Sequence, residues 1–413
     1  MKMTKILSLV LVLVMALSCF SFVGCGETET IEIKFWVSTT TGVDEFFMEQ
    51  VEAFKAAHPE YEFTIKIEKV GEDNAATEVL KDVQTAADIY CFAQDQISRL
   101  VVGGALAPLG TQAAATVKAE NDYESVKAAT VGNMIYGYPM TSDNGYYLYY
   151  DSSIISDEEA KTLEGILAAC ERSGKKFGYN ITSGWYTSGI FFSQPVGSGT
   201  PLCETEWTYS TDGKNPVALK DTVAENGLVA MKLMHQLASS GLLADTSDSF
   251  EGTAALVTGI WQANAAEAAY GDYMKATKLP TFTMDGETYQ MGSFSGFKLI
   301  GCKPQSDEKK AEICNALALW LTSEEAQLER YYEFQWGPSN KAAQNNTDVK
   351  ENKLLSALRE QNVYGVPQGV IPNDWWAIMA ELGTKCKDAN LTDDALRAAL
   401  DDYNTKANAL VVK

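Results

Sequence analysis

Arginine and histidine are scarce in this chain of 413 residues. There are five arginines and only two histidines, His58 and His235, which both lie in helical patterns. Because arginine forks are the preferred clamps for phosphate and carboxylate groups, their scarcity disfavours an anionic ligand. Two isolated histidines likewise disfavour a histidine-based catalytic centre or metal cluster. We therefore expect neither a resident metal nor a cofactor.

The eight cysteines contain no Cys-x-x-Cys pair, so zinc-binding and dithiol redox spacings are both missing. Cys91 lies in an apolar segment that is typical of a buried strand, which favours a core thiol. Disulfide connectivity cannot be read from the spacing. Two cysteines, Cys19 and Cys25, lie in the N-terminal segment, and the other six are Cys91, Cys170, Cys203, Cys302, Cys314 and Cys386.

The short motifs of common enzyme classes are also missing. There is no Gly-x-Ser-x-Gly elbow, Walker loop, complete Gly-x-Gly-x-x-Gly or His-Glu-x-x-His. A secreted glycoside hydrolase with paired carboxylates stays open as an alternative, since any acidic chain offers such pairs. We expect that the chain is not an enzyme, and turnover of starch oligosaccharides would favour the alternative.

Acidic residues are in large excess, with a formal net charge of −22. This charge becomes −24 if the first 25 residues are removed, because they contain two lysines and no acidic residue. Such a chain repels nucleic acid and anionic lipid, so neither is an expected partner. The apolar content of 46% and the charged content of 21% are typical of an ordered globular protein.

The N-terminal segment has the layout of a secretory signal peptide. Lys2 and Lys5 precede an apolar run at residues 6–14, which is shorter than the roughly 20 residues of a membrane-spanning helix. The end of the segment, Phe22-Val-Gly-Cys25, resembles the lipobox of bacterial lipoproteins, with Phe22 where that family usually has leucine. The resemblance implies lipidation at Cys25 and an anchor on the extracellular face of the cell membrane. Cleavage at Cys19 and plain secretion without lipid are the alternatives.

Residues 26–30 form a polar tether, and the remaining length suggests two lobes rather than one core. Apolar and polar residues alternate at 31–37 and again at 61–67, which predicts two strands. Between them, Phe47, Val51 and Phe54 form the stripe of an amphipathic helix over 43–58. A helix near 74–87 and a strand at 88–92 follow. This alternation predicts a parallel α/β sheet.

The later segments continue the α/β pattern. A capping box, Ser156 to Glu159, predicts a helix that runs through Arg172 and stops at Gly174. Further predicted strands are at 135–139, 146–150, 176–181 and 254–259, and residues 199–220 are predicted to be a loop or a small excursion. Predicted helices cover 222–240, 308–321, 324–334, 352–361, 374–387 and 392–410.

An ordered series of short segments resembles one protein family. It includes Ile33-Lys-Phe-Trp36, Phe54-Lys-Ala-Ala-His-Pro59 and Gly103-Gly-Ala-Leu-Ala-Pro-Leu109, and later Ala254 to Trp261 and Gly337-Pro-Ser-Asn340. In this order they are similar to the extracellular solute-binding proteins of ABC sugar importers, the maltose/maltodextrin-binding proteins among them. The series covers nearly the whole chain after the N-terminal segment.

The resemblance implies a two-lobed α/β fold of the periplasmic-binding-protein type (type II), with ligand in a cleft between lobes joined by hinge segments. The N-terminal lobe would comprise 31–142 and 297–341, and the C-terminal lobe 143–296 and 342–413. It also implies a monomer that delivers an oligosaccharide to the permease subunits of an ABC importer. A ligand that touches both lobes favours the closed form.

The resemblance further implies aromatic platforms that stack on sugar rings. Trp185, Trp261 and Trp375 stand at stacking positions of the family, and Trp376 stands at the position of another aromatic residue. The family has a tyrosine where this chain has Trp185, and a tryptophan where it has Phe92. Core packing is the alternative for each of these aromatic residues.

Three polar residues correspond to hydroxyl-binding positions. Asp95 matches an aspartate of the family, although the arginine expected next is Gln96. Asp143 matches a glutamate at the hinge, and Asn144 is expected to share its role. The alternatives are a helix cap for Asp95 and a turn for Asp143. Residues 38–41 replace a charged family loop with four hydroxyl side chains.

Two readings compete with a glucan-binding protein. A surface adhesin or carbohydrate-anchoring module is commonly all-β, which this helix-rich pattern is not. Within the family, the ligand could instead be a xylo-, manno- or galacto-oligosaccharide, a polyol or a peptide. Scarce arginine and abundant tryptophan favour a neutral sugar.

Overall fold

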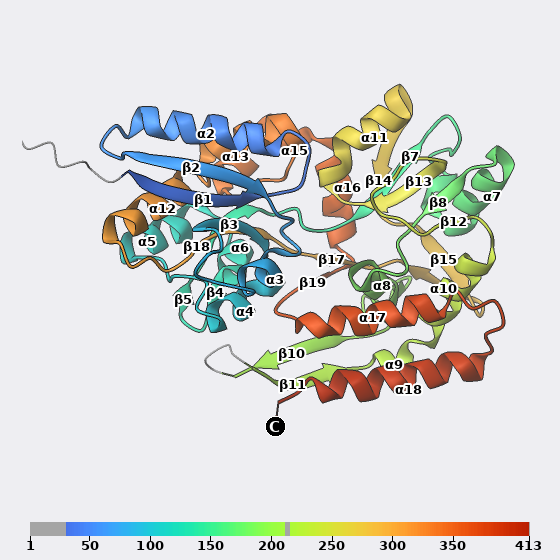
Figure 1. Ribbon diagram of the computed structural model, residues 1–413. Coiled ribbons are helices and arrows are strands. Elements are labelled where there is room, and N and C mark those ends of the chain that lie inside the picture. The colour runs from blue at the N-terminus through green and yellow to red at the C-terminus, as the bar shows by residue number, and fades with distance from the viewer. Residues whose placement is uncertain (1–29, 211–214, 413) are drawn as a thin grey trace, which may run out of the picture.

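The computed structural model describes residues 30–210 and 215–412. It has two α/β lobes side by side, each built around a five-stranded mixed sheet (Figure 1). The predicted signal peptide, its lipidation site Cys25 and most of the tether lie outside the described residues. Within the described ranges, no helix is both long and apolar enough to cross a membrane.

The sheet of the first lobe joins segments that are far apart in the chain. Its order is β2-β1-β3-β18-β6, with β1 parallel to both β2 and β3, and β18 antiparallel to β3 and β6. Strand β18 enters this sheet more than 150 residues after β6, so the chain visits the first lobe twice. The strands are β1 (Ile31–Val37), β2 (Phe63–Lys69), β3 (Ile89–Ala93), β6 (Tyr138–Thr141) and β18 (Lys298–Cys302).

Helices on both faces of this sheet bury apolar stripes. In α2, Phe47, Val51 and Phe54 are fully buried, as the spacing predicts. The helices are α2 (Val43–Ala57), α3 (Ala75–Val79), α4 (Ile97–Val102), α5 (Thr111–Glu120), α6 (Tyr123–Ala128), α12 (Glu308–Trp320), α13 (Glu324–Phe334), α14 (Lys341–Gln344) and α15 (Thr347–Glu351). A small hairpin joins β4 (Thr130–Val131) to β5 (Met134–Ile135).

The sheet of the second lobe has the order β12-β8-β13-β7-β14. Strands β12, β8 and β13 are parallel, whereas β7 is antiparallel to both β13 and β14. On β7, even-numbered side chains pack in one hydrophobic cluster and Tyr147 and Tyr149 in the other, so the strand is buried on both faces. The strands are β7 (Tyr147–Asp151), β8 (Lys176–Gly178), β12 (Leu243–Ala244), β13 (Thr253–Thr258) and β14 (Met274–Thr277).

The C-terminal third supplies helices to the second lobe, where α17 packs along α8 and α18 (Figure 1). The helices of the second lobe, from all parts of the chain, are α7 (Leu163–Ser173), α8 (Gly184–Phe191), α9 (Val223–Asn226), α10 (Leu228–Ser239), α11 (Ala263–Tyr270), α16 (Lys353–Asn362), α17 (Asn373–Lys385) and α18 (Asp393–Ala409). The shorter strands are β9 (Gln194–Pro195), β10 (Thr205–Tyr209), β11 (Pro216–Asp221), β15 (Thr281–Met284), β16 (Glu287–Gln290), β17 (Ser293–Ser295) and β19 (Gly365–Pro367).

Several predicted element ends are confirmed. Strand β1 covers the predicted residues, and α7 ends where Gly174 adopts a left-handed conformation with φ of 68°. Strand β13 leads directly into Trp261 through the short 3-10 helix η3 (Ile260–Gln262). The predicted lobe boundaries stay a prediction, because one hydrophobic cluster runs from the first sheet onto one face of the second.

Two predicted helices differ from the structure. The helix predicted near 74–87 stops at Val79, and the Asp82 side chain then accepts a hydrogen bond from the Gln84 amide at 3.0 Å, which stabilises a turn instead. The capping box forms, with Glu159 Oε2 accepting from the Ser156 amide at 2.9 Å, but it opens only the 3-10 turn Glu159–Lys161. Helix α7 has its own cap, Thr162.

Two other predictions were also wrong in part. Residues 199–220 contain the hairpin of β10 and β11 rather than a loop alone, and the exposed and half-buried side chains of β10 alternate as in a strand. The strand predicted at 176–181 ends at Gly178, and the chain then turns into α8. Helix α8 escapes prediction because Gly, Ser and Thr, which are poor helix formers, fill half of it.

Candidate functional site

The ends of the central strands face each other across the space between the lobes. In the first sheet, the carboxyl ends of β1, β2 and β3 lie at one edge together with the start of β18, since Lys298 pairs with Ala93. In the second sheet, the carboxyl ends of β8, β12 and β13 lead into loops that face the first lobe. Open α/β sheets bind ligands at such edges.

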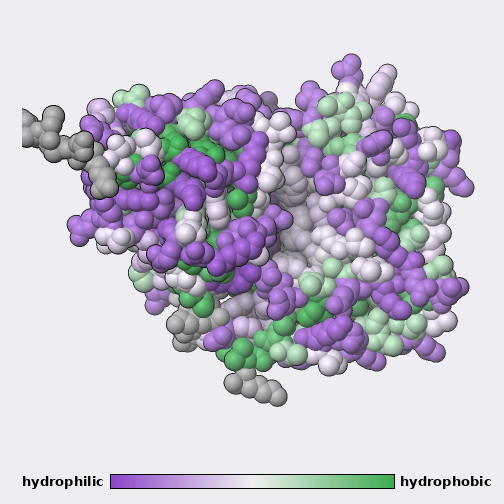
Figure 2. Space-filling model, in the orientation of Figure 1, coloured by the Kyte–Doolittle hydropathy of each residue, from purple (hydrophilic) through white to green (hydrophobic). Residues whose placement is uncertain are grey.

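A cavity of about 780 Å³ occupies this space, and Figure 2 shows a recess between the lobes at the same place. Its volume is within the range of small-molecule sites. Side chains of both lobes line it, and they are Ser38, Thr39, Thr40, Thr41, Glu72, Asp73, Asp95, Asn144, Ser183, Trp185, Tyr186, Ser247, Asp248, Trp261, Gln262, Asn264, Lys298, Phe334, Trp336, Gln368 and Trp376.

The second lobe contributes an aromatic wall. Trp185 and Tyr186 begin α8, Trp261 lies in η3, and Trp376 lies in the first turn of α17. The ring centroids of Trp185 and Trp261 are 5.8 Å apart with planes at 46°. Flat, partly exposed indoles of this kind can cover the apolar CH face of a sugar ring.

Two glycines allow this wall to form. A Cβ at Gly184 would lie 2.0 Å from the Trp376 carbonyl oxygen, so α8 and α17 approach closely only because residue 184 has no side chain. A Cβ at Gly259 would lie 2.1 Å from the Trp261 ring, so this glycine lets the indole fold back over the end of β13. The two glycines thereby let the Trp376 backbone approach α8 and the Trp261 ring pack against the end of β13.

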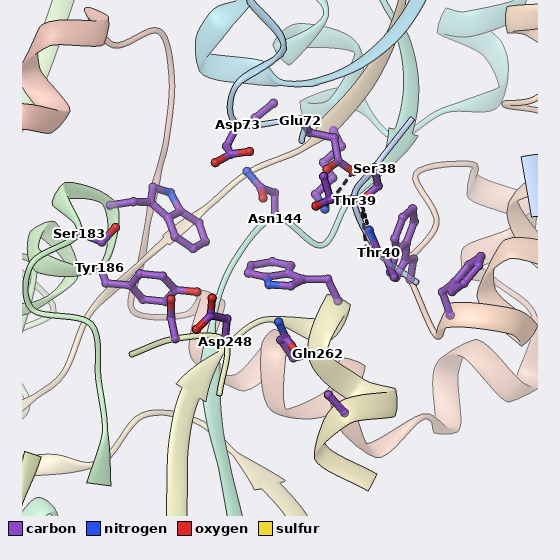
Figure 3. Close-up of a pocket in the computed structure, with 18 of the residues that line it drawn as sticks. Ser38, Thr39, Thr40, Glu72, Asp73, Asn144, Ser183, Tyr186, Asp248 and Gln262 are labelled. Atoms are coloured by element: carbon purple, nitrogen blue, oxygen red, sulfur yellow. Dashed lines mark hydrogen bonds and ion pairs between the residues drawn. The ribbon is translucent and has the colours of Figure 1, made fainter. Parts of the chain in front are cut away.

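Tyr186 is fixed beneath the aromatic wall and is 6% exposed. Its ring centroid lies 4.9 Å from that of Trp185 and 4.8 Å from that of Tyr146. Burial raises the pKa of Tyr186 to about 12, and the nearby hydroxyl groups of Thr258 and Ser247 partly oppose this rise. The phenol is therefore neutral at physiological pH. It lies beside Asp248 in the cavity wall (Figure 3).

The first lobe contributes carboxylates and hydroxyls. Glu72 and Asp73 follow β2, and Ser38 to Thr41 follow β1 (Figure 3). The Ser38 Oγ and Thr40 Oγ1 atoms lie 3.1 Å apart in a hydrogen bond. These groups can accept and donate hydrogen bonds at the hydroxyl rim of a ligand.

Asp95 lies in the 3-10 helix η1 (Gln94–Gln96) directly after β3 and is 8% exposed. Burial raises the pKa of its carboxyl to about 7, although the charge of Arg99 and a hydrogen bond with Trp376 oppose the rise. The Asp95 side chain accepts no helix-cap hydrogen bond at the start of α4, whose N-cap residue is Gln96. Among the described residues, its Oδ1 atom has no hydrogen-bond partner. The side chain thus offers an unused acceptor at the cavity.

The predicted site residues divide into two groups. Trp185, Trp261, Trp376, Asp95 and Asn144 line the cavity. The Asn144 Nδ2 atom donates a hydrogen bond to Gln368 Oε1 at 3.1 Å, so both amides sit where the lobes meet. Their contact with a ligand stays a prediction.

Direct contact is corrected for Trp375, Phe92 and Asp143, which do not line the cavity. Trp375 is fully buried, and its indole N–H donates to Tyr403 Oη at 3.0 Å in the core of the second lobe. Phe92 is fully buried in the first lobe. Asp143 is 2% exposed, and its carboxylate accepts a hydrogen bond from the Gly337 amide at 2.6 Å.

Several lining residues were missed by the sequence reasoning. Glu72 and Asp73 follow a predicted strand, so the rule that open α/β sheets bind ligands at the carboxyl ends of their strands could have found them. For Lys298 and Trp336 the family resemblance predicts only that 297–341 belongs to the first lobe, and no local pattern predicts that β18 pairs with β3. Among the residues that the structure describes, no cluster of three or more potential metal ligands occurs.

The chain is similar to known proteins both in sequence and in structure. The family model described as bacterial extracellular solute-binding protein matches residues 49–357. No curated protein matches the sequence of the chain.

Three similar solved structures illustrate the fold. The maltodextrin-binding protein MalE1 from L. casei BL23 is 21% identical with a TM-score of 0.73, over 92% of this chain and 99% of that one. The Thermus thermophilus maltotriose-binding protein is 16% identical with a TM-score of 0.75, over 92% and 100%. The maltose/maltodextrin-binding domain MalE from Bdellovibrio bacteriovorus is 16% identical with a TM-score of 0.74, over 92% and 100%. The predicted two-lobed fold is confirmed.

The raised pKa of Asp95 predicts a pH-dependent free energy of unfolding. The folded state binds this proton more tightly than the unfolded state. The contribution of the bound proton to the free energy of unfolding is therefore fully present below pH 4 and is lost as pH rises through about 7. Asp95→Asn mimics the protonated form, so it should match the wild type at pH 4 and exceed it at pH 8, by up to about 4 kcal/mol. Urea unfolding from pH 4 to 8 measures the difference.

Asp157→Asn is the control of opposite sign. A hydrogen bond from Lys275 lowers the pKa of this exposed carboxyl, so its replacement should weaken the fold slightly at pH 8 and not at low pH. A pH-independent offset between Asp95→Asn and the wild type would contradict the assignment of a buried, proton-binding carboxyl at residue 95.

Proposed function

Because the chain belongs to the bacterial extracellular solute-binding proteins, we propose that it captures neutral oligosaccharides, malto-oligosaccharides above all, in the cavity between its lobes and delivers them to an ABC importer. Proteins of this family bind solutes, so the expectation that the chain is not an enzyme is confirmed by its family membership. The geometry of the site supports the choice of ligand and the mechanism of its delivery.

One observation carries the choice of ligand: an aromatic wall on the second lobe faces hydroxyls and carboxylates on the first (Figure 3). A sugar ring has an apolar CH face and a polar rim of hydroxyls. Trp185, Trp261 and Trp376 would cover the face, and Asp95 and Asn144 would bind the rim. The names of the similar structures support this choice, since the Thermus thermophilus protein is bound with maltotriose.

The charge of the cavity favours a neutral sugar over an acidic one. Its lining contains four carboxylates, Glu72, Asp73, Asp95 and Asp248, and a single ammonium, Lys298. An anionic ligand would meet this excess of negative charge at close range, which costs affinity. A sulfated, phosphorylated or uronic-acid oligosaccharide is therefore disfavoured.

Ligand contact with both walls provides a mechanism for delivery. The two walls belong to different sheets, so a ligand that touches both binds more tightly when the lobes are close and shifts the population towards that form. The permease subunits of the importer would then distinguish the loaded monomer from the empty one. The anchor at Cys25 would keep the protein at the extracellular face of the membrane.

The choice of ligand predicts micromolar or tighter binding of maltotriose and longer malto-oligosaccharides in calorimetry. Trp261→Ala should weaken this binding roughly thirty- to a hundredfold, because loss of one stacking indole removes about 2–3 kcal/mol of apolar burial. The same calorimetry with xylo-oligosaccharides and with oligopeptides shows whether the protein prefers another class of ligand.

Trp320→Ala is the matched control, since this indole is half-buried in the first lobe beside Phe54 and does not line the cavity. It should leave maltotriose affinity unchanged while it lowers the melting temperature. Binding of peptides with no response to any sugar would contradict the proposal. If Trp261→Ala instead binds normally but melts far lower, Trp261 belongs to the core.

The proposed anchor predicts a native protein that begins at Cys25 with lipid attached. Mass spectrometry of the N-terminus from membrane fractions measures this, and Cys25→Ser should release the protein into the medium. Cys19→Ser serves as the control and should leave the anchor intact. A mature N-terminus elsewhere, or lipid that persists in Cys25→Ser, would show that the lipobox interpretation is wrong.

A further inference from the structure

Lys298 extends into the cavity from the first residue of β18. Its ammonium nitrogen lies 5.0 Å from the ring centroid of Trp261 and 5.1 Å from that of Trp336. Both distances are within the range of cation–π attraction. A single ammonium therefore lies against two indoles that belong to the wall of the proposed binding site.

The ammonium is buried and paired. It lies 3.4 Å from Glu72 Oε1, and both side chains are only 9% exposed. Burial lowers the pKa of Lys298, but the charges of Glu72 and Asp143 outweigh this effect, so the pKa is raised overall and the group stays charged. An ion pair taken out of water adds little net stability compared with apolar side chains of similar size. The fold alone does not account for a charge at this position.

The groups around the ammonium come from different parts of the molecule. Lys298 is fixed in the first sheet, where its backbone pairs with Ala93 and Thr141. Trp336 follows α13 and is buried in the first lobe. Trp261 follows β13 of the second sheet. The contact between Lys298 and Trp261 thus joins the two sheets at the proposed stacking platform.

We propose that Lys298 is a positioning residue of the binding site, whose ammonium holds the Trp261 indole against the first lobe and so presets the platform for a sugar ring. This inference rests on the proposed function for its ligand. A platform that is already ordered loses less conformational freedom when a ligand binds, which raises affinity. Glu72 keeps the ammonium in place, and Trp336 holds it from the side of the first lobe.

The same strand offers a matched control at its other end. Lys303 follows β18, its side chain is also 9% exposed, and it is paired with Asp88 at 3.6 Å. Its ammonium donates to the carbonyl oxygens of Gln84 and Ala86, at 3.1 and 3.0 Å. It is not among the residues that line the cavity. Lys303→Met therefore removes an equally buried paired lysine that has no role at the platform.

The experiment compares Lys298→Met, Lys298→Arg and Lys303→Met with the wild type. The readouts are the tryptophan emission spectrum without ligand, the dissociation constant for maltotriose and the melting temperature. Lys298→Met should shift the emission, since a charge beside an indole changes the energy of its excited state, and should weaken maltotriose binding about tenfold. Lys298→Arg should keep an emission spectrum and a maltotriose affinity close to those of the wild type, because a guanidinium also stacks on indoles.

Lys303→Met should lower the melting temperature without changing the emission or the affinity. If Lys298→Met does not fold, Lys298→Met with Glu72→Gln removes both charges and should shift the emission and weaken binding in the same direction. Unchanged emission and affinity in a folded Lys298 variant would overturn the proposal. So would a loss of affinity that Lys303→Met reproduces, since that would be a general effect of destabilisation.

Failure of the proposed function gives a different pattern. If the wild type binds no maltotriose, the sugar ligand is wrong, and the emission spectra still decide whether Lys298 contacts the two indoles. As a further check, Trp336→Phe should reduce the emission shift that Lys298→Met causes. Equal shifts in the presence and absence of Trp336 would exclude its part in the arrangement.

Discussion

Two sets of parallel strand ends that face each other position most of the loops that form the site. β1, β2 and β3 each stop at one edge of the first sheet, and the next residues of the chain are the hydroxyls and carboxylates of the cavity. In the second lobe, β8 and β13 end in the same way, and the segments that follow them carry the aromatic residues Trp185 and Trp261. The loops need no regular structure of their own, because the sheets fix both of their ends.

The two walls are stabilised by different physical means. Trp261 packs against Gly259, and α8 approaches the Trp376 backbone at Gly184, so close van der Waals contact holds the aromatic wall. The polar wall contains buried ionisable groups: burial raises the pKa of Asp95 to about 7, and Lys298 remains charged beside Glu72. Buried ionisable groups lower the stability of the fold unless they are paired. Their presence is typical of sites selected for binding rather than for stability.

The sequence predicts β1 and α2 well, because period-two alternation at 31–37 and the apolar stripe on α2 are local signals, but it predicts a parallel sheet, and the antiparallel β18 makes that sheet mixed. It also places Trp261 correctly, since a buried strand leads directly into it. The sequence does not predict which side chains reach the cavity where this depends on contacts between segments that are far apart in the chain. Trp375 and Trp376 are neighbours, and only the packing of α17 against α18 and α8 determines that Trp375 bonds to Tyr403 while Trp376 lines the cavity. Lys298 reaches the site only through the antiparallel pairing of β18 with β3.

The central claim is that one ligand contacts loops of both sheets at once. Hydrogen–deuterium exchange of the wild-type protein with and without maltotetraose tests it most directly, because protection is read separately for each loop. The account predicts slower exchange after β1, β2 and β3 in the first lobe, at residues 38–41, 72–73 and 94–96. It predicts slower exchange at the same time in the second lobe, at residues 183–186 and 259–262. Protection confined to one lobe, or located away from these strand ends, would contradict it.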